Sequence, residues 1–287
     1  MNIPPRNAPE KERGNRMPSI TVFISEIPEQ VPAGITAYQL RDARRPGADI
    51  VIFNGAAITE DRVLREHDSL VFITRGDIPG PHEFQACMTA RHTPGVHKRL
   101  ARAVVGIAGL GGLGSAVAIA LARLGIGSLV LADFDVVEPS NLNRQQYYAD
   151  QLGMLKTKAL GDTLTRINPY GHYETHPVRL TRENIPAIFR TCDIIVEAFD
   201  LEEEKSMLVE TVLNSFPRVP VVAASGMAGH GSANTITTRK VGARLYVCGD
   251  TVSASKPGCG LMAPRVGVTA HHQANLVLRL LLGEEDN

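Results

Sequence analysis

The sequence has few cysteines, no excess of charge of either sign and no long apolar run. Its 30 Lys and Arg residues balance 30 Asp and Glu residues, so no basic field points to nucleic acid or an anionic membrane. No apolar stretch reaches the roughly 20 residues that span a bilayer. No internal repeat of about 20–50 residues is visible. These absences favour a water-soluble protein with neither a nucleic acid nor a membrane as partner.

The cysteines are scattered along the chain. None of them forms a C-x-x-C pair, the usual element of a structural zinc site, so we predict no zinc. The four positions are Cys87, Cys192, Cys248 and Cys259.

The N-terminus lacks the apolar core of a signal peptide. Residues 1–16, MNIPPRNAPEKERGNR, are rich in proline, arginine and asparagine. We expect a disordered tail over residues 1–17, with Met17 as a candidate for the natural start. We also expect a cytoplasmic protein.

A strand–loop–helix–strand pattern follows later in the chain. Val104–Ala108 is a short apolar run typical of a buried parallel strand, Ser115–Leu124 has helical apolar character, and Leu129–Ala132 is a second strand. Between the first strand and the helix, a G-x-G-x-x-G spacing permits a tight turn and close approach of the backbone to phosphate. The helix N-terminus would present free N–H groups to an anion. The glycines of this loop are Gly109, Gly111, Gly112 and Gly114.

Polar side chains are concentrated just beyond the second strand, where open α/β sheets bind ligands. Arginine and lysine beside a nucleotide loop suit a triphosphate, whose charge builds on phosphate oxygens during transfer. The loop alone is as compatible with a nicotinamide or flavin cofactor as with ATP, but the polar group favours ATP. Its members are Asp133, Asn141, Asn143, Arg144, Gln145, Lys156 and Lys158.

These motifs resemble the ThiF/MoeB group, bacterial relatives of ubiquitin-activating enzymes that adenylate the C-terminal glycine of small β-grasp sulfur carriers. The similarity runs from about Arg91 to Gly283 and most resembles the shorter ThiF type, which is linked to thiamine biosynthesis. It implies a homodimer, and a Rossmann-like α/β domain with a mostly parallel sheet and an antiparallel extension. The motifs that carry it, in the order of the family, are GLGGLGS, DFDVVEPSNLNRQ, TRINPY, EAFD and ASGMAGHG.

The resemblance also implies roles for single residues. Asp133 matches the acid that binds the ribose. Asn141 and Arg144 match the pair that contacts the phosphates, with Gln145 beside them.

Further along, Lys156 matches the phosphate-binding lysine, and Lys158 is a less favoured register. Asp200 matches the acid that holds Mg²⁺. Arg91 is a candidate for an arginine that reaches the ATP of a partner subunit.

Each assignment has a simpler alternative. For Arg144 and Lys156, the alternative is that they are solvated charges on the protein surface. Asp133 suits a helix or turn cap. Asp200 opens the run DLEEEK, which suits the start of a helix with acids at its positive end.

The N-terminal part is predicted to form a separate module. Residues 20–75 show a β-hairpin, a helix over Ala37–Ala43 and two further strands, and LREHDSLVFITRG resembles a ThiS-like β-grasp (α+β) carrier. Gly76 continues into the next segment, so it lacks the free carboxylate that a carrier needs. We therefore interpret this module as a pseudo-carrier that positions a genuine carrier, covers the site or supports the dimer, or as a degenerate appendage.

The predicted boundaries are a tail (1–17), a β-grasp domain (18–76), a connector with a helix at Glu83–Ala90 (77–102) and an adenylyltransferase domain (103–287). The remaining elements expected in the last domain are helices over 156–166, 182–190, 205–216 and 269–282, strands near 172–177, 193–198 and 219–224, and two antiparallel strands in TITTRK and RLYVCG.

The predicted reaction is ATP- and Mg²⁺-dependent adenylation of a ThiS-like carrier, after which sulfur from a donor protein gives a thiocarboxylate. Some relatives relay sulfur through a cysteine. Cys248 and Cys259 lie in the C-terminal half of the chain, but neither matches a motif of the family. A free cysteine is more often a buried, unreactive thiol. Three alternatives remain: activation of another carboxylate or a tRNA nucleoside, a nicotinamide-dependent oxidoreductase, and a regulatory ATP-binding protein without turnover.

Overall fold

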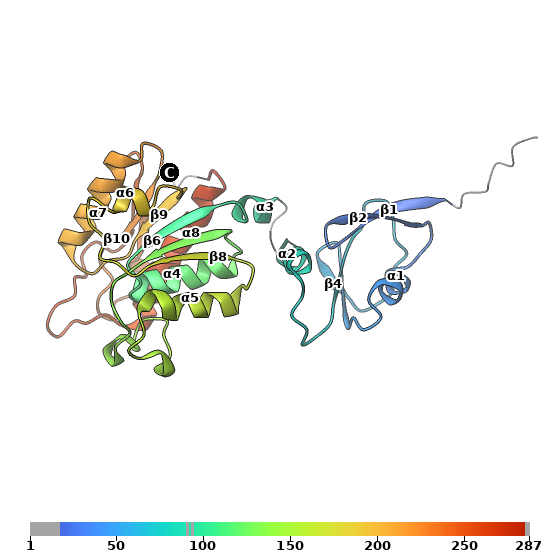
Figure 1. The fold of residues 1–287 in the computed structure, drawn as a ribbon, viewed down its shortest axis with the longest axis horizontal. Coiled ribbons are helices and arrows are strands. Elements are labelled where there is room, and N and C mark those ends of the chain that lie inside the picture. Colours follow the sequence, from blue (N-terminus) through green and yellow to red (C-terminus); the bar gives the residue numbers. More distant parts are fainter. Residues whose placement is uncertain (1–17, 90–91, 93–94, 285–287) are drawn as a thin grey trace, which may run out of the picture. The chain divides into compact units, whose positions relative to one another are not determined.

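The computed structural model describes residues 18–89, 92 and 95–284. The chain divides into two compact units, residues 1–91 and 92–287. Figure 1 shows the first in blue to teal and the second in green to red.

The first unit is a five-stranded sheet with one helix packed on each face. The strand order is β2-β1-β5-β3-β4, with β1 and β5 parallel at its centre and the other pairs antiparallel. The strands are β1 (Ser19–Ile24), β2 (Ile27–Pro32), β3 (Ile50–Phe53), β4 (Ala56–Ile58) and β5 (Ser69–Ile73).

Helix α1 (Ala37–Arg44) begins at a capping box. The hydroxyl of Thr36 accepts a hydrogen bond from the Gln39 N–H at 3.2 Å, and the Thr36 N–H donates to the Gln39 side chain at 3.1 Å. Two of the N–H groups that a helix start leaves without partners are thereby satisfied. Its Leu40 is buried in a core with Val51 and Leu70 of the sheet.

The opposite face of this sheet is covered by α2 (Pro81–Thr89). Alternate residues of a strand point to opposite faces, and Ile52 and Val71 are therefore buried with Ala86 of α2 rather than with α1. The segment expected to be a connector thus begins with a helix that completes the core of the first unit.

The second unit is built on a seven-stranded sheet, parallel except for the edge strand β11. The strand order is β11-β12-β10-β9-β6-β7-β8. The strands are β6 (Val104–Ala108), β7 (Ser128–Ala132), β8 (His172–His176), β9 (Ile194–Glu197), β10 (Val221–Ala224), β11 (Thr237–Lys240) and β12 (Leu245–Gly249).

Helices cover both faces of this sheet (Figure 1). One face packs against the main core with α4, α5 and α8, and the other packs with α6 and α7. The chain runs from β6 outward to β7 and β8, then returns to β9 on the other side, so the strand order reverses at β6. Ligands of open α/β sheets bind outside the carboxyl ends of the strands at such a point. The helices are α3 (Val96–Leu100), α4 (Gly112–Arg123), α5 (Lys156–Ile167), α6 (Ile185–Ile188), α7 (Glu202–Ser215) and α8 (Ala263–Leu281), with short 3-10 helices η1 (Pro139–Asn141), η2 (Ala149–Gln151) and η3 (Ala233–Thr235).

Helices α4 and α7 each begin three residues before the expected residue, and two other helices differ more in extent from the sequence-based expectation. The helix predicted over 182–190 is reduced to α6 because the Asn184 side chain accepts from the Thr181 N–H and donates to the Arg179 carbonyl, which favours a turn. The last helix begins at Ala263 rather than Thr269. No helix among the described residues is long and apolar enough to cross a membrane.

Candidate functional site

The glycine loop lies at the point where the strand order reverses. Gly109 has a left-handed φ of +88°, and a Cβ there would lie 2.8 Å from the carbonyl oxygen of Ala198, just after β9. A Cβ on Gly114 would lie 1.8 Å from the Gly109 carbonyl oxygen. These two glycines are therefore required by the backbone packing of the loop.

Gly111 has a different environment. A Cβ there would meet only the side-chain nitrogen of Gln145, at 3.8 Å. At neighbouring Gly112, a Cβ would lie 2.9 Å from Val266 and 3.4 Å from Arg144. Packing thus demands glycine at position 112, whereas at position 111 glycine leaves the start of α4 open to a ligand.

Asp133, at the end of β7, anchors the loop. Its carboxylate accepts hydrogen bonds from the Leu110 N–H at 2.7 Å and the Asp135 N–H at 2.8 Å, and the residue is only 9% exposed. The turn-capping role that the sequence left open is therefore present. Each carboxylate oxygen can accept a further bond, so a role toward ribose stays a prediction.

The polar segment after β7 is fastened to the glycine loop by two hydroxyls. Ser115 donates to the Gly111 carbonyl at 2.6 Å and accepts from the Gln146 N–H at 3.1 Å. Tyr147 donates to the Leu110 carbonyl at 2.8 Å, and burial raises its pKa, which keeps the hydroxyl protonated. Residues 144 and 145 are thereby held beside the loop.

Within this segment, Arg144 and Gln145 carry the chemistry expected from the sequence. Arg144 is half-buried, and its guanidinium donates to the Ser140 carbonyl at 3.2 Å and to the Asn143 side chain at 2.9 Å. Gln145 is buried, and its amide oxygen has no hydrogen-bond partner among the described residues. Such buried acceptors are rare, and this one is available to a hydrogen-bond donor of a ligand.

Asn141 has a structural contact of its own. It is buried, and its side chain accepts from the Glu138 N–H at 3.0 Å, which closes the turn of η1. The side-chain N–H₂ group remains as a donor for a ligand.

Lys156 begins α5 and is only 6% exposed. Its ammonium group lies 2.8 Å from the Asp135 carboxylate. The interpretation of Lys156 as a solvated charge is therefore wrong. Lys158, by contrast, is exposed and pairs with Asp162 on the same helix.

Asp200 is exposed and lies just beyond β9. The run DLEEEK does begin a helix with acids in its first turn, namely Glu202, Glu203 and Glu204, but the N-cap residue of α7 is Leu201, so Asp200 lies one residue before the cap. The preceding Phe199 lies 3.0 Å from the Cβ position of Gly109, which brings the turn holding Asp200 against the glycine loop.

A buried ion pair, which was not predicted from the sequence, lies behind this turn. Glu197, at the end of β9, is fully buried and accepts from the Phe199 N–H at 2.7 Å and the Ala224 N–H at 3.3 Å. The Lys205 ammonium lies 3.1 Å from the same carboxylate. Burial raises the pKa of Glu197, and Lys205 opposes that shift. The pair joins β9 to β10 and fixes the turn that presents Asp200; the lone Glu in the apolar run IIVEAF was the available signal.

Two further sets of residues were predicted from the sequence. Arg91 lies outside the described residues. The four cysteines are free and separate: Cys248 is fully buried, and burial raises the pKa of Cys192 to about 12. No group of three or more potential metal-ligating His, Cys, Asp or Glu side chains occurs in the described part of the chain.

Comparison with known proteins agrees with this architecture. Residues 86–287 match the ThiF family, and residues 20–76 match a ThiS-like ubiquitin family. The adenylyltransferase and sulfurtransferase UBA4 of Candida glabrata is 31% identical over 196 residues, which cover 66% of this chain and 45% of that protein. UBA4 of Saccharomyces cerevisiae is 30% identical over 206 residues, 68% of this chain and 46% of that protein. The chain thus spans less than half the length of these curated relatives.

Solved structures share the fold over much of this chain. E. coli tRNA N6-threonylcarbamoyladenosine dehydratase, TcdA, in complex with AMP, has a TM-score of 0.64 and 19% identity, over 72% of this chain and 98% of that chain. E. coli MccB with AMPCPP and MccA has a TM-score of 0.54 and 21% identity, over 74% of this chain and 66% of that chain. The chain belongs to the ThiF family and carries a ThiS-like ubiquitin domain in its N-terminal unit.

Proposed function

We propose that this protein uses ATP to adenylate the C-terminal glycine of a small ThiS-like sulfur carrier. The observation that carries the proposal is the arrangement at the glycine loop. Arg144 and Gln145 are held against the loop, and the turn bearing Asp200 packs on it from the next strand. A nicotinamide site does not need this set of basic and amide groups.

The residues present fit a nucleotide. Gly111 leaves open space at the N-terminus of α4, where free N–H groups favour a phosphate. The partnerless amide oxygen of Gln145 requires a donor, which a hydroxyl or amino group of a nucleoside supplies. The relatives named adenylyltransferase support ATP as the substrate, as do the AMP and ATP complexes of TcdA.

The reaction is a nucleotidyl transfer. A carboxylate oxygen of the carrier attacks the α-phosphorus, the bond from that phosphorus to the bridging oxygen breaks, and pyrophosphate leaves. Arg144 and Lys156 stabilise charge on the phosphoryl oxygens, and Asn141 donates a hydrogen bond beside them. The product is the acyl adenylate of the carrier.

Asp200 is the residue that we propose for holding Mg²⁺. Its carboxylate is exposed and does not cap α7, and Mg²⁺ in nucleotide sites is held by one or two carboxylates together with substrate phosphates. The bound ion would neutralise phosphate charge. The Glu197–Lys205 pair would keep the Asp200 turn in place.

The next step requires a sulfur donor, which we propose to be another protein. The terminal sulfur of a persulfide on that protein attacks the carbonyl carbon of the acyl adenylate, and AMP leaves, which gives an acyl disulfide between carrier and donor. A thiol then attacks the donor's sulfur, the S–S bond to the acyl sulfur breaks, and the carrier leaves as a thiocarboxylate while the donor keeps a disulfide with that thiol. The thiamine pathway is our proposal for the carrier's destination, and the cytoplasm is our proposal for the compartment.

The fused ThiS-like domain is not the substrate in this proposal. Gly76 is followed by α2, whose Ala86 is fully buried on the sheet of that domain. Its chain therefore has neither a free carboxylate nor a free tail at this position. We propose a pseudo-carrier role, in positioning a genuine carrier, covering the site or supporting the dimer.

A truncation tests the pseudo-carrier role. Because α2 belongs to the first unit and ends at Thr89, the truncation should remove residues 1–90, which keeps Arg91, rather than stop at residue 75. A lower rate or weaker carrier affinity in pyrophosphate exchange supports the role. Unchanged values contradict it.

We further propose a homodimer in which Arg91 of one subunit reaches the nucleotide of the other. Light scattering of the full chain tests the assembly: a monomer at micromolar concentration contradicts it. Mixing an Arg91→Ala chain with an Arg144→Ala chain tests the exchange of residues. If Arg91 acts across the interface, mixed dimers regain activity that neither variant has alone.

ATP–pyrophosphate exchange across a panel of carriers with Gly-Gly tails tests the main proposal. Exchange that depends on the carrier and on its free terminal carboxylate supports it. Exchange driven by a small carboxylate or by tRNA would favour the alternative substrates. Binding of NAD in preference to ATP in calorimetric titration would favour the oxidoreductase.

A further inference from the structure

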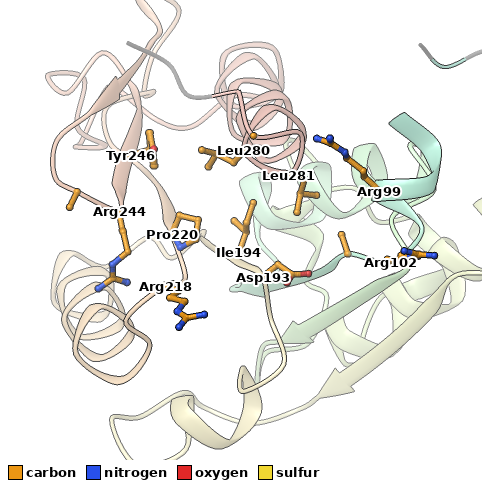
Figure 2. Close-up of a pocket in the computed structure, with 13 residues that line it drawn as sticks. Arg99, Arg102, Asp193, Ile194, Arg218, Pro220, Arg244, Tyr246, Leu280 and Leu281 are labelled. Atoms are coloured by element: carbon orange, nitrogen blue, oxygen red, sulfur yellow. The ribbon is translucent and has the colours of Figure 1, made fainter. Parts of the chain in front are cut away.

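A cavity of about 550 Å³ lies at the amino ends of β9, β10 and β12. Figure 2 shows labelled side chains from these strand ends and from α8 arranged around it. The glycine loop and Asp200 lie at the carboxyl ends of the same parallel sheet. The cavity is therefore separate from the candidate nucleotide site, on the opposite edge of the sheet.

Positive side chains dominate the lining of this cavity. Four arginines contribute to it, against one acidic residue, Asp193. The topology explains the clustering, because Arg102, Arg218 and Arg244 each precede a strand of the parallel sheet by one to three residues, and the starts of parallel strands meet at one edge. The fourth is Arg99 of α3.

Two of these arginines have structural partners. The Arg244 guanidinium donates to the carbonyls of Phe216 and Val219 at 2.6 and 2.8 Å, beyond the end of α7. Arg99 donates to the carbonyl of Leu282, just after α8, at 2.8 Å. Cations at helix C-termini are favoured by the unpaired carbonyls there, so stabilisation of these helix ends accounts for both residues.

The other two arginines have no such explanation. Arg102 and Arg218 are exposed, and neither guanidinium group has a hydrogen bond or ion pair among residues 18–89, 92 and 95–284. The Asp193 carboxylate accepts a hydrogen bond from the Val104 N–H at 2.8 Å. The cavity therefore carries a surplus of positive charge with two uncommitted guanidinium groups at its mouth.

The cavity also has apolar walls. Its volume falls in the range of small-molecule pockets, which are mostly apolar with a few convergent polar groups. A guanidinium fork matches the oxygens of a phosphate or a carboxylate. The apolar lining residues are Ile194, Pro220, Tyr246, Leu280 and Leu281.

We propose that this cavity, which we call the arginine pocket, binds a small organic anion. The ligand presents a phosphate or carboxylate group to Arg102 or to Arg218, which lie on either side of Asp193 in Figure 2, and an apolar body to the walls. A volume of about 550 Å³ and partly apolar walls favour a small molecule over an extended acidic peptide or a nucleic acid.

The test measures binding of three probes to the full chain by calorimetry: 1-naphthyl phosphate, 1-naphthoate and neutral 1-naphthol. The proposal expects at least one anionic probe to bind, with affinity at least about tenfold above that of naphthol. The affinities of 1-naphthyl phosphate and 1-naphthoate, compared with each other, show which anionic group the site prefers. No binding of either anion at millimolar concentration, or equal binding of naphthol, overturns the proposal.

Variants locate the binding. Arg102→Ala with Arg218→Ala should weaken the anionic probe at least about tenfold, since charge-assisted hydrogen bonds are lost. The matched control, Lys98→Ala with Arg123→Ala, removes two exposed charges outside the cavity and should change affinity by less than about twofold. Equal losses in both variants overturn the proposal. The Arg144→Ala chain should bind the probe as the unmodified chain does; loss of binding there would assign the signal to the glycine loop and overturn it.

Discussion

The ammonium group of Lys156 lies 2.8 Å from the carboxylate of Asp135, and the Lys156 N–H donates to the Asp135 carbonyl at 2.9 Å. The lysine is 6% exposed, whereas the Asp135 side chain is 47% exposed. The buried cation is thus held near the glycine loop by a carboxylate that faces solvent. A phosphate that enters the site can replace the Asp135 carboxylate as the ion-pair partner of the Lys156 ammonium group.

The first prediction separates the two partners of that pair. Lys156→Met should lower the rate of ATP–pyrophosphate exchange by about 100-fold, the usual effect of losing one group that stabilises developing charge. Asp135→Asn should lower it much less, because the lysine keeps its place at the start of α5. The measurement is exchange at saturating ATP. Equal losses in both variants would mean that the pair serves the fold rather than the reaction.

A second prediction contrasts two glycines of one loop. Gly114→Ala should lower the thermal midpoint or prevent folding, because its Cβ would lie 1.8 Å from the Gly109 carbonyl oxygen. Gly111→Ala should leave the midpoint nearly unchanged, because its Cβ meets only the Gln145 side chain at 3.8 Å. The same change should weaken ATP binding at least about tenfold if phosphate approaches the backbone there. Calorimetric titration of ATP measures this affinity. An undiminished ATP affinity in the Gly111→Ala chain would mean that no phosphate lies against the backbone at position 111.

A third prediction concerns the buried pair behind Asp200. Lys205→Met should destabilise the fold by about 3–5 kcal/mol, since it leaves the Glu197 carboxylate buried without its cation. Glu197→Gln together with Lys205→Met should recover much of that loss. Urea unfolding at neutral pH measures both. Additive losses in the double variant would show that the two side chains are not coupled.

The same pair gives a pH dependence. Burial raises the pKa of Glu197 above its ordinary value of 4.5, and removing Lys205 should raise it further. The folded state then keeps a proton that the unfolded state releases, so the contribution of Glu197 to the stability of the Lys205→Met chain should be fully present below pH 4.5 and be lost as the pH rises through the raised pKa. The double variant, which has no carboxylate at position 197, should not show this fall. A flat profile for Lys205→Met would contradict the burial of a charged Glu197.

The fourth prediction concerns the cysteines. Cys259→Ala should leave ATP–pyrophosphate exchange unchanged, because exchange requires only the adenylation step, which precedes sulfur transfer. Mass spectrometry after alkylation should find Cys192 and Cys248 protected in the folded chain, since both are buried and burial raises the pKa of Cys192. Loss of exchange in a folded Cys259→Ala chain would place this thiol in the adenylation step itself.

Much of the architecture follows from local sequence patterns. The strand at Val104–Ala108 coincides with β6, the antiparallel pair in TITTRK and RLYVCG is confirmed as β11 and β12, and the family matches confirm the ThiF resemblance. Apolar runs and turn residues are local features, so a single sequence contains enough information for them. The connector is different: whether α2 packs on the β-grasp sheet depends on the unpaired apolar face of distant strands.

The residues proposed for the candidate site could be named from the sequence, but the contacts between them could not. Arg144, Lys156 and Asp200 stand in recognisable motifs, yet the partner of Lys156, the orphaned oxygen of Gln145 and the buried Glu197–Lys205 pair arise only when separate segments meet. The glycine at position 111 shows the same limit of prediction from sequence. The G-x-G-x-x-G spacing marks three equivalent glycines, whereas packing requires Gly109 and Gly114 and leaves Gly111 free.

The central claim is that the groups beside the glycine loop act on a reacting triphosphate, and Arg144→Ala tests it most directly. Steady-state pyrophosphate exchange with a Gly-Gly-tailed carrier should show kcat lowered by about 100-fold or more, with the KM for ATP changed by only a few-fold. That pattern means that the guanidinium acts in the transition state. A raised KM with unchanged kcat, or exchange indistinguishable from that of the unmodified chain, would contradict the account.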